Sequence, residues 1–242
     1  MDIVILAGGK CPPDLAEASG VEDRASIPFG DRTCLQIVAE ALGEFGDLVV
    51  VGGPEVSGAR QTQAGRTFIE SVALGLEQVK SDRMMIATVD IPCLTREAVG
   101  DFMAASDPAA LNYPIIRAEE CEREFPGMKR TTLRLREGVF TGGNLGLVPS
   151  ETMRQAIPVL EHAYAHRKSP LKLAQLVGLD TMLRLVMGKL APRTLTIPAL
   201  ESSVGRFLKI PVKAVITSHP SIGADIDSAE QYRALLALKN LG

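Results

Sequence analysis

Glycines and acidic residues lie beside the apolar runs and helix-like segments of this chain, and residues of both types can contact a ligand. Gly8 and Gly9 come directly after the first apolar run, and a backbone without a Cβ lets amide N–H groups approach phosphate oxygens. Asp90 follows another apolar run, and Asp225 and Asp227 precede a helix-like segment. Aspartate at such positions is also common as a turn former or a helix cap. The glycines predict contact with a phosphate group, and the residues alone leave the role of the aspartates open.

The glycine loop does not match two common phosphate-binding motifs. A dinucleotide fingerprint needs G-x-G-x-x-G at the start of a helix, whereas residues 8–13 read GGKCPP, and the prolines obstruct that helix. A P-loop needs G-x-x-x-x-G-K-[ST], which this loop lacks. A plain tight turn is the competing interpretation of the two glycines taken alone.

Strand-length apolar runs alternate with segments of helical periodicity, and this alternation must position the loop. We expect strands at 2–8, 47–53, 83–90, 109–116 and 212–218, and helices at 34–46, 68–79, 95–106 and 228–242. The order predicts right-handed βαβ units in an α/β fold, a three-layer α/β/α sandwich with a mostly parallel, Rossmann-like sheet. Ligands of such sheets bind beyond the carboxyl ends of the strands. Those ends are expected at Gly8-Gly9, Gly52-Gly53, Asp90 and Tyr113.

The second half of the chain departs from this alternation. Residues 117–138 are rich in charge, and residues 139–149 are expected to form one strand interrupted by glycines. Residues at about 150–210 have helix-like spacing and are expected to form a lid, an acceptor-binding region or the face of a homodimer. The sequence leaves these alternatives open. Without a repeat or a low-complexity linker, residues 1–242 are expected to form one domain.

Composition and charge exclude several classes of protein. The 242 residues carry a formal net charge of −3, so no basic excess favours nucleic acid or an acidic membrane as partner. No apolar run approaches the roughly 20 residues that cross a bilayer, and the first run is too short for a signal peptide. Four cysteines without a C-x-x-C pair, and only three histidines, do not suit a zinc site. We expect reduced thiols in a soluble, cytoplasmic protein.

The stretch RASIPFGDRTCLQIVAEAL at residues 24–42, after LAGG at residues 6–9, resembles the nucleotidyltransferases of the GT-A type. These include molybdenum-cofactor guanylyltransferase-like proteins, sugar-1-phosphate nucleotidyltransferases and methylerythritol cytidylyltransferases, which share the nucleotide-diphospho-sugar transferase fold. Their signature runs L-A-G-G-x-G-x-R, and then K-x-L-x-x-x-G-G-x-P-[ML]-[LI]. The resemblance implies that the nucleotide binds at Leu6, Ala7, Gly8 and Gly9.

This chain departs from the signature at two positions. A longer loop with Pro12 and Pro13 replaces the G-x-R, and Arg24 stands where the signature has lysine. Arginine keeps the positive charge and can bind a phosphate through two parallel hydrogen bonds. The resemblance therefore implies that Arg24 grips the triphosphate in catalysis, with Lys10 in place of the missing arginine.

Three later motifs extend the resemblance. TVDIPCLT at residues 88–95 looks like the D-x-P segment whose aspartate holds the divalent metal, which implies that role for Asp90. TGGN at residues 141–144 is similar to the glycine-rich strand entry on the acceptor side, where Gly143 and Asn144 would contact the acceptor. GADIDSAEQY at residues 223–232 resembles the terminal segment that completes the metal site. Either Asp225 or Asp227 would then be the second ligand, and the other would cap the following helix.

The remaining candidates have plainer alternatives. Gly65 and Ser71 lie where related families approach the base and the ribose, although close helix packing explains them equally well. Arg130 could bind an acceptor phosphate, or could belong to a solvated charged loop. Asn144 beside two glycines also suits an ordinary turn.

The function that the resemblance implies is Mg²⁺-dependent nucleotidyl transfer. The enzyme would join an NTP to a phosphorylated small-molecule acceptor, release pyrophosphate, and most resemble the molybdopterin-guanylyltransferase branch. One alternative keeps the fold and uses a nucleotide-sugar, with DID at residues 225–227 as the D-x-D motif of a glycosyltransferase. Another is a nucleotide-binding protein without catalysis, because the G-x-G-x-R loop is altered.

Overall fold

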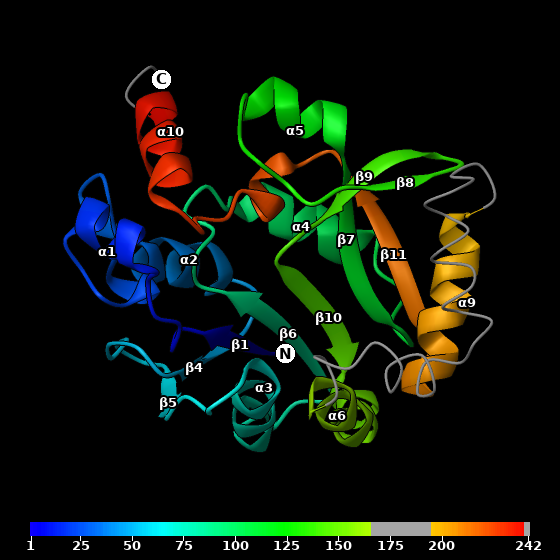
Figure 1. The fold of residues 1–242 in the computed structure, drawn as a ribbon. Coiled ribbons are helices and arrows are strands. Elements are labelled where there is room, and N and C mark those ends of the chain that lie inside the picture. The colour runs from blue at the N-terminus through cyan, green and yellow to red at the C-terminus, as the bar shows by residue number, and fades with distance from the viewer. Residues whose placement is uncertain (166–194, 240–242) are drawn as a thin grey trace.

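A mixed β-sheet organises the chain (Figure 1). The computed structural model describes residues 1–165 and 195–239. Within them nine strands form one sheet, in the order β5-β4-β1-β6-β10-β7-β9-β8 with β11 paired to β7. The strands are β1 (Asp2–Leu6), β4 (Asp47–Val51), β5 (Arg60–Thr62), β6 (Arg83–Thr88), β7 (Leu111–Arg117), β8 (Leu133–Leu135), β9 (Gly138–Gly142), β10 (Leu145–Pro149) and β11 (Val212–Thr217). Strands β5, β4, β1 and β6 run parallel, as do β7 and β11, whereas β8, β9 and β10 pair antiparallel with their neighbours.

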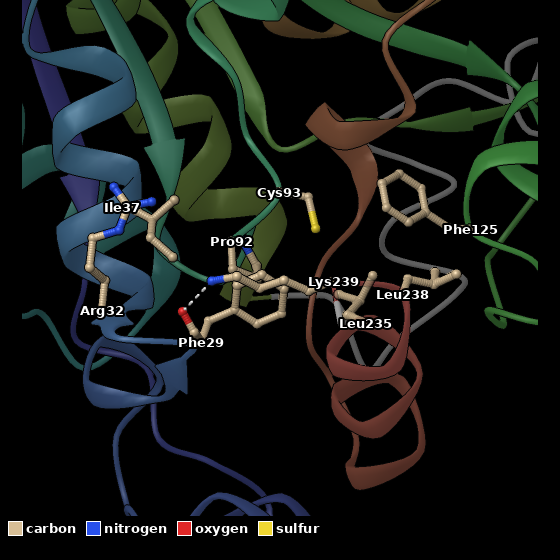
Figure 2. A pocket seen from close by; sticks show the side chains of 9 residues that line it. All are labelled: Phe29, Arg32, Ile37, Pro92, Cys93, Phe125, Leu235, Leu238 and Lys239. Atoms are coloured by element: carbon tan, nitrogen blue, oxygen red, sulfur yellow. Dashed lines mark hydrogen bonds between the residues drawn. The ribbon is translucent and has the colours of Figure 1, made fainter. Parts of the chain in front are cut away.

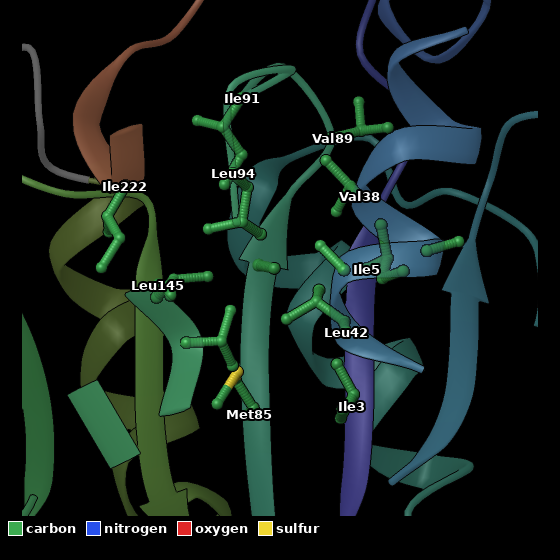
Figure 3. Packing of buried hydrophobic residues seen from close by; sticks show 14 of the residues in the cluster. Ile3, Ile5, Val38, Leu42, Met85, Val89, Ile91, Leu94, Leu145 and Ile222 are labelled. Carbon is green, nitrogen blue, oxygen red and sulfur yellow. The ribbon is translucent and has the colours of Figure 1, made fainter. Parts of the chain in front are cut away.

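Helices cover both faces of the sheet. The helices on one face are α2 (Cys34–Leu42) and α4 (Arg96–Ala104), and those on the other are α3 (Phe68–Glu77), α6 (Ser150–Ala165) and α9 (Ile197–Leu208). Successive side chains of a strand point to opposite faces, so Ile3 and Ile5 of β1 pack towards α2, while Val4 packs towards α3. Figure 3 shows the first of these layers, with Leu42 of α2 against β1. The predicted three-layer α/β/α fold is confirmed.

The expected strands and helices of the first half are present, with ends that differ by a few residues. Capping explains where the helices begin: Thr33, Thr67 and Thr95 each accept a hydrogen bond from the backbone N–H three residues later. The Gln36 side chain in turn accepts a hydrogen bond from the Thr33 backbone N–H, which completes a capping box.

Several expectations were wrong, most of them for the second half. Residues 139–149 form two strands, β9 and β10, and β10 lies between β6 and β7, antiparallel to both. Tyr113 lies inside β7, not at its carboxyl end. The loop predicted to contain Pro12 and Pro13 includes the start of helix α1 (Pro13–Ser19), which tolerates proline because its first residues need no N–H partner. Helices α6 and α9 confirm the helical character of residues 150–210 at both ends, and residues 166–194 lie outside the described part.

A third apolar cluster ties the C-terminal segment to the loops beyond the carboxyl ends of the strands. It joins α1, the hairpin of β2 (Pro28–Phe29) and β3 (Arg32–Thr33), and α10 (Ala229–Lys239). The Tyr232 hydroxyl donates to the Pro28 carbonyl at 2.9 Å, and the Ala229 N–H donates to Asp14 Oδ2 at 3.0 Å. This packing holds residues 224–228 beside the N-terminal loop, where the predicted metal ligands must meet.

Candidate active site

The chain after β1 passes very close to its neighbours. A Cβ on Gly8 would lie 2.2 Å from Ala64 Cβ, and a Cβ on Gly52 would lie 2.7 Å from Gly8 Cα. Both distances are far below van der Waals contact, so glycine is required at both positions. The backbone of the loop after β1 is therefore pressed against residues that precede α3, and its own amides remain open to a ligand.

A cavity of about 340 Å³ lies beside these glycines. The predicted residues that line it are Leu6, Gly8, Gly9, Arg24, Gly65, Ser71 and Asp90. Ala7, also predicted to bind the nucleotide, is fully buried and donates its N–H to the Val51 carbonyl at 2.9 Å. The structure thus gathers the nucleotide-binding candidates, except Ala7, around one space.

Arg24 links the two distant acidic segments. It opens the short 3-10 helix Arg24–Ser26, and its Nη1 lies 2.7 Å from Asp90 Oδ2, 2.7 Å from Asp227 Oδ1 and 2.8 Å from the Ile226 carbonyl oxygen. Burial alone would lower the pKa of Arg24, but the two carboxylates outweigh burial and raise it. Residues 90 and 227 therefore meet at one guanidinium, as the metal-site prediction requires.

The carboxylates around Arg24 outnumber it. Burial, and then the nearby charges of Asp227 and Asp90, raise the pKa of Asp225 to about 6. Asp90 Oδ1 is buried and has no hydrogen-bond partner within the described residues. A site with this excess of unsatisfied oxygen attracts a cation.

The donor set fits a hard divalent cation. Three oxygens, from Asp90, Asp227 and the Ile226 carbonyl, surround one position. The positively charged Arg24 Nη1 occupies that position in this structure. Oxygen ligands of this kind suit Mg²⁺. Among the described residues no group of three or more metal-binding side chains has the spacing of a finished metal site. Arg24 must therefore turn away before a cation can take this place.

Comparisons with known proteins identify the family. A family model described as the MobA-like NTP transferase domain matches residues 3–192. The chain belongs to this family. It is a nucleotidyltransferase, and the predicted resemblance is confirmed.

Solved structures agree with this assignment. A hypothetical transferase from Thermus thermophilus is 38% identical, with a TM-score of 0.84 over 95% of this chain and 98% of that one. A 2-C-methyl-D-erythritol 4-phosphate cytidylyltransferase, also from Thermus thermophilus, is 17% identical, with a TM-score of 0.57 over 98% of both chains, and shares the fold. The comparison with curated proteins gives no match.

The predicted acceptor residues of this NTP transferase lie along the turn between β9 and β10. The Gly143 N–H donates to the Pro114 carbonyl at 2.9 Å, and a Cβ on Gly143 would lie 2.7 Å from Ile222 Cγ2. The Asn144 backbone bonds the Ile222 carbonyl at 3.0 Å and accepts from the Thr88 N–H at 3.2 Å. Their backbones tie the turn to the segment that precedes Asp225.

Arg130 joins the same region from the other side. Its Nη1 donates to the Gly223 carbonyl, its guanidinium lies 5.8 Å from the centre of the Phe125 ring, and its buried Nε finds no partner within the described residues. Arg130 therefore contacts the chain two residues before Asp225. This placement is compatible with an acceptor phosphate.

Lys10 is not brought to the carboxylates. Its side chain is exposed, and Nζ lies 3.7 Å from Glu22 Oε2. Its carbonyl oxygen instead accepts a bond from Arg24 Nε at 3.4 Å, and its backbone bridges to Asp23. The geometry gives Lys10 a part in holding Arg24, while its ammonium group points elsewhere.

The candidate nucleotide cavity, that of about 340 Å³, has six lining residues that were not singled out in the sequence: Arg66, Thr67, Phe68, Thr88, Val89 and Tyr164. Thr88 could have been found, because it lies two residues before Asp90 and alternation places both on one side of the strand. Its Oγ1 is buried without a hydrogen-bond partner in the described chain. Phe68 could not have been found, because the sequence pattern predicts burial for an apolar residue in an amphipathic helix.

A second cavity, of about 300 Å³, lies under α10 (Figure 2) and has a different character. Its lining is mostly apolar, including Phe29, Phe125 and Leu235. Lys239 Nζ donates to the Phe29 carbonyl at 3.0 Å and lies 4.9 Å from the centre of the Phe29 ring. Burial raises the pKa of the Cys93 thiol to about 11, so this thiol stays protonated and is a poor nucleophile. None of the predicted site residues lines this cavity.

Proposed function

We propose that this NTP transferase moves a nucleoside monophosphate from an NTP to a phosphate-bearing small molecule and releases pyrophosphate, with Mg²⁺ as its cofactor. The observation that supports this is the meeting of the glycine loop with Arg24 and Asp90 in one cavity, beside Asp227. The loop offers amides for phosphates, the arginine offers positive charge, and the carboxylates offer ligands for the cation.

The chemistry needs alignment and charge more than a base. An oxygen of the acceptor phosphate attacks the α-phosphorus of the NTP, the bond from the α-phosphorus to the bridging oxygen breaks, and pyrophosphate leaves with that electron pair. The attacking oxygen is already anionic at neutral pH, so no strong general base is required. Arg24 and the loop amides would hold the phosphates in line and neutralise developing charge. Mg²⁺, held by Asp90 and Asp227, would add positive charge at the same phosphates.

Molybdopterin is the acceptor that we propose to test first. The sequence resemblance favours that branch, and the matching family model is described as MobA-like. The residues that we assign to the acceptor are Arg130, Gly143 and Asn144, which adjoin the segment of Asp225.

The test is pyrophosphate release across four NTPs and a panel of phosphorylated acceptors, with and without Mg²⁺. We expect release that needs Mg²⁺ and that Asp90→Asn greatly reduces. Asp47→Asn is the matched control, because Asp47 is an exposed carboxylate at the opposite edge of the sheet. Consumption of a nucleotide-sugar without pyrophosphate, or NTP binding without any turnover, would contradict the proposal.

The cellular location that we propose is the cytoplasm. All four cysteines are free thiols, and two of them, Cys34 and Cys121, are buried, which suits a reducing compartment. None of the helices in the described ranges has the length and apolar character to cross a membrane.

A further inference from the structure

Phe68 is exposed, whereas half of the aromatic rings in this chain are buried. Its exposed fraction is 52%, the largest among the large hydrophobic side chains of the described residues. By contrast Phe29, Phe102 and Phe140 are each less than 5% exposed. The exposed ring lines the nucleotide cavity together with Gly8 and Arg24. A large apolar ring at the wall of a polar cavity needs a partner to cover it.

The backbone around Phe68 is held firmly. Thr67 Oγ1 accepts the Glu70 N–H at 3.1 Å, Glu70 Oε2 accepts the Arg66 N–H at 2.8 Å, and Ser71 Oγ accepts the Gly65 N–H at 3.0 Å. Phe68 is the first residue of α3, directly after this cap. The backbone that carries the ring is therefore fixed before a ligand arrives, which lowers the entropic cost of binding.

The sheet topology brings Phe68 and Asp90 to the cavity from different elements. The strand order is β5-β4-β1-β6: α3 follows β5 and packs on β1 and β4, whereas Asp90 follows β6. Adjacent strands lie about 4.8 Å apart, so β4 and β6, on either side of β1, are on the order of 10 Å apart. An NTP is elongated, with its base at one end and its phosphates at the other. With phosphates at the glycines, Arg24 and Asp90, the base falls on the α3 side.

We propose that the ring of Phe68 is the stacking surface for the nucleobase of the NTP. This inference rests on the proposed function and adds a role for one residue, in the region where the resemblance already implies that the base binds. Every base has an apolar π-face, so an aromatic platform accepts the base by stacking and leaves the choice among bases to other groups. Thr88 of β6 lines the same cavity, and its buried Oγ1 has no hydrogen-bond partner within the described residues.

A fluorescence experiment tests the stacking directly. The chain contains no tryptophan, so Phe68→Trp creates a single reporter at the proposed contact. We expect NTPs to quench its emission in a saturable manner, and inorganic triphosphate, which has no base, to leave it unchanged. Quenching by inorganic triphosphate to the same degree, or no quenching by an NTP that calorimetry shows to be bound, would overturn the inference.

Affinity measurements provide the second test. By calorimetry, Phe68→Ala is expected to weaken NTP binding about 5- to 100-fold, and Phe68→Tyr to retain it, because stacking needs an aromatic ring. Inorganic triphosphate should bind all three proteins equally. Equal losses for NTP and triphosphate, or no loss for either, would contradict the stacking role. The exposed ring contributes little to the fold, so the melting temperature of Phe68→Ala should stay close to that of the wild type.

The two proposals can fail separately. If the wild type binds no NTP and releases no pyrophosphate, the proposed function is wrong and the stacking proposal falls with it. If the wild type turns over NTP and Phe68→Ala binds it with unchanged affinity, only the stacking proposal is wrong.

Discussion

The two edges of the central sheet hold their carboxylates in opposite ways. Asp2 begins β1 at the amino edge, where the N–H groups of Lys80 and Ser81 and the Ser81 hydroxyl bind it at 2.6 to 2.8 Å, and Arg60 pairs with it. At the carboxyl edge, Asp90 and Asp227 share one arginine. Burial alone would raise the pKa of Asp2, but its hydrogen bonds lower it to about 2, whereas burial and neighbouring carboxylates raise the pKa of Asp225 to about 6.

The difference separates a carboxylate whose oxygens are bound within the fold from the carboxylates that we propose as cation ligands. Asp2 has partners for both of its oxygens, so nothing further can bind it without breaking the structure. Asp90 keeps a buried oxygen without a partner in the described chain, as Thr88 does two residues earlier. Arg83, at the amino end of β6, is an exception, because part of its guanidinium is also buried without a partner there. Unsatisfied groups mark a site when several share one cavity.

The largest expected effect comes from exchanging the two kinds of aspartate. Asp90→Asn should reduce kcat/KM on the order of 10²- to 10³-fold, because it removes charge at the reacting phosphates. It should change the free energy of unfolding by less than about 1 kcal/mol, since it also relieves repulsion among carboxylates. Asp2→Asn should do the reverse, costing about 3 kcal/mol of stability because it leaves Arg60 without its charge partner. Steady-state kinetics and urea unfolding of both variants check this, and matching effects at both positions would remove the distinction between the edges.

The sequence could make only part of this distinction. The strand order placed Asp90 at a ligand-binding carboxyl end, and the family motif then gave it a role, but neither shows which carboxylate oxygens find partners in the fold. The partners of Asp2 come from residues 60 and 80–81, and the parallel register of the sheet, which the sequence pattern does not contain, brings them together. The side-chain direction of Lys10 could not be predicted for the same reason, because it depends on a backbone bridge to Asp23.

The fold was more predictable than the site, and most predictable in its first half. Strands rich in Val, Ile and Leu are buried on both faces and have clear sequence patterns, as β1 and β4 do. The sequence pattern merged β9 and β10 into one strand. The antiparallel place of β10 between β6 and β7 could not be predicted, because these neighbours are distant in the sequence and such an insertion leaves no local signal. Pro13 was interpreted as part of a loop although proline also suits the first turn of a helix.

A second comparison concerns the arginines that pair with these aspartates. Arg24→Met and Arg60→Met should each lower the free energy of unfolding by about 2 kcal/mol without divalent cations, because each leaves carboxylates unpaired. Millimolar Mg²⁺ should restore stability only to Arg24→Met, since loss of the Arg24 guanidinium leaves its position among three oxygens open to the cation. Thermal unfolding with and without Mg²⁺ measures this directly. Equal recovery of both variants, or of neither, would argue against a cation site at Arg24.

The pH dependence of stability should have opposite signs at the two edges. Folded Asp2 has a pKa of about 2, below its ordinary 3.8, so its contribution is present above pH 4 and is lost as the pH falls towards 2. Folded Asp225 has a pKa of about 6, above its ordinary 3.8, so the folded state binds more protons between these values and loses stability as the pH rises through them.

Urea unfolding from pH 2 to 8 tests both signs. Asp225→Asn should remove the decline in stability between about pH 4 and pH 6, and should be more stable than the wild type at pH 7. Asp2→Asn should remove the loss below pH 4 and be less stable at neutral pH. If the stability of the wild type rises between pH 4 and 6, or if Asp225→Asn leaves the stability profile unchanged, then folding does not raise the pKa of Asp225.

The smallest expected effect comes from removing one of two hydroxyl groups, which lie at opposite ends of strand β6. Ser81, just before β6, accepts the Asp2 N–H at 2.7 Å and lies 2.8 Å from the Arg83 carbonyl oxygen, whereas Thr88, at the end of β6, has a buried hydroxyl without a partner in the described residues. Thr88→Val keeps the shape and removes the unsatisfied group, so it should raise the free energy of unfolding by about 1 kcal/mol, while Ser81→Ala should lower it by about 1 to 3 kcal/mol. NTP affinity should fall only in Thr88→Val, because Thr88 lines the candidate nucleotide cavity and Ser81 does not. A gain in stability with a loss in binding is the combination expected of a group held unsatisfied for its ligand. Loss of stability in Thr88→Val would instead make its hydroxyl part of the fold, as that of Ser81 is.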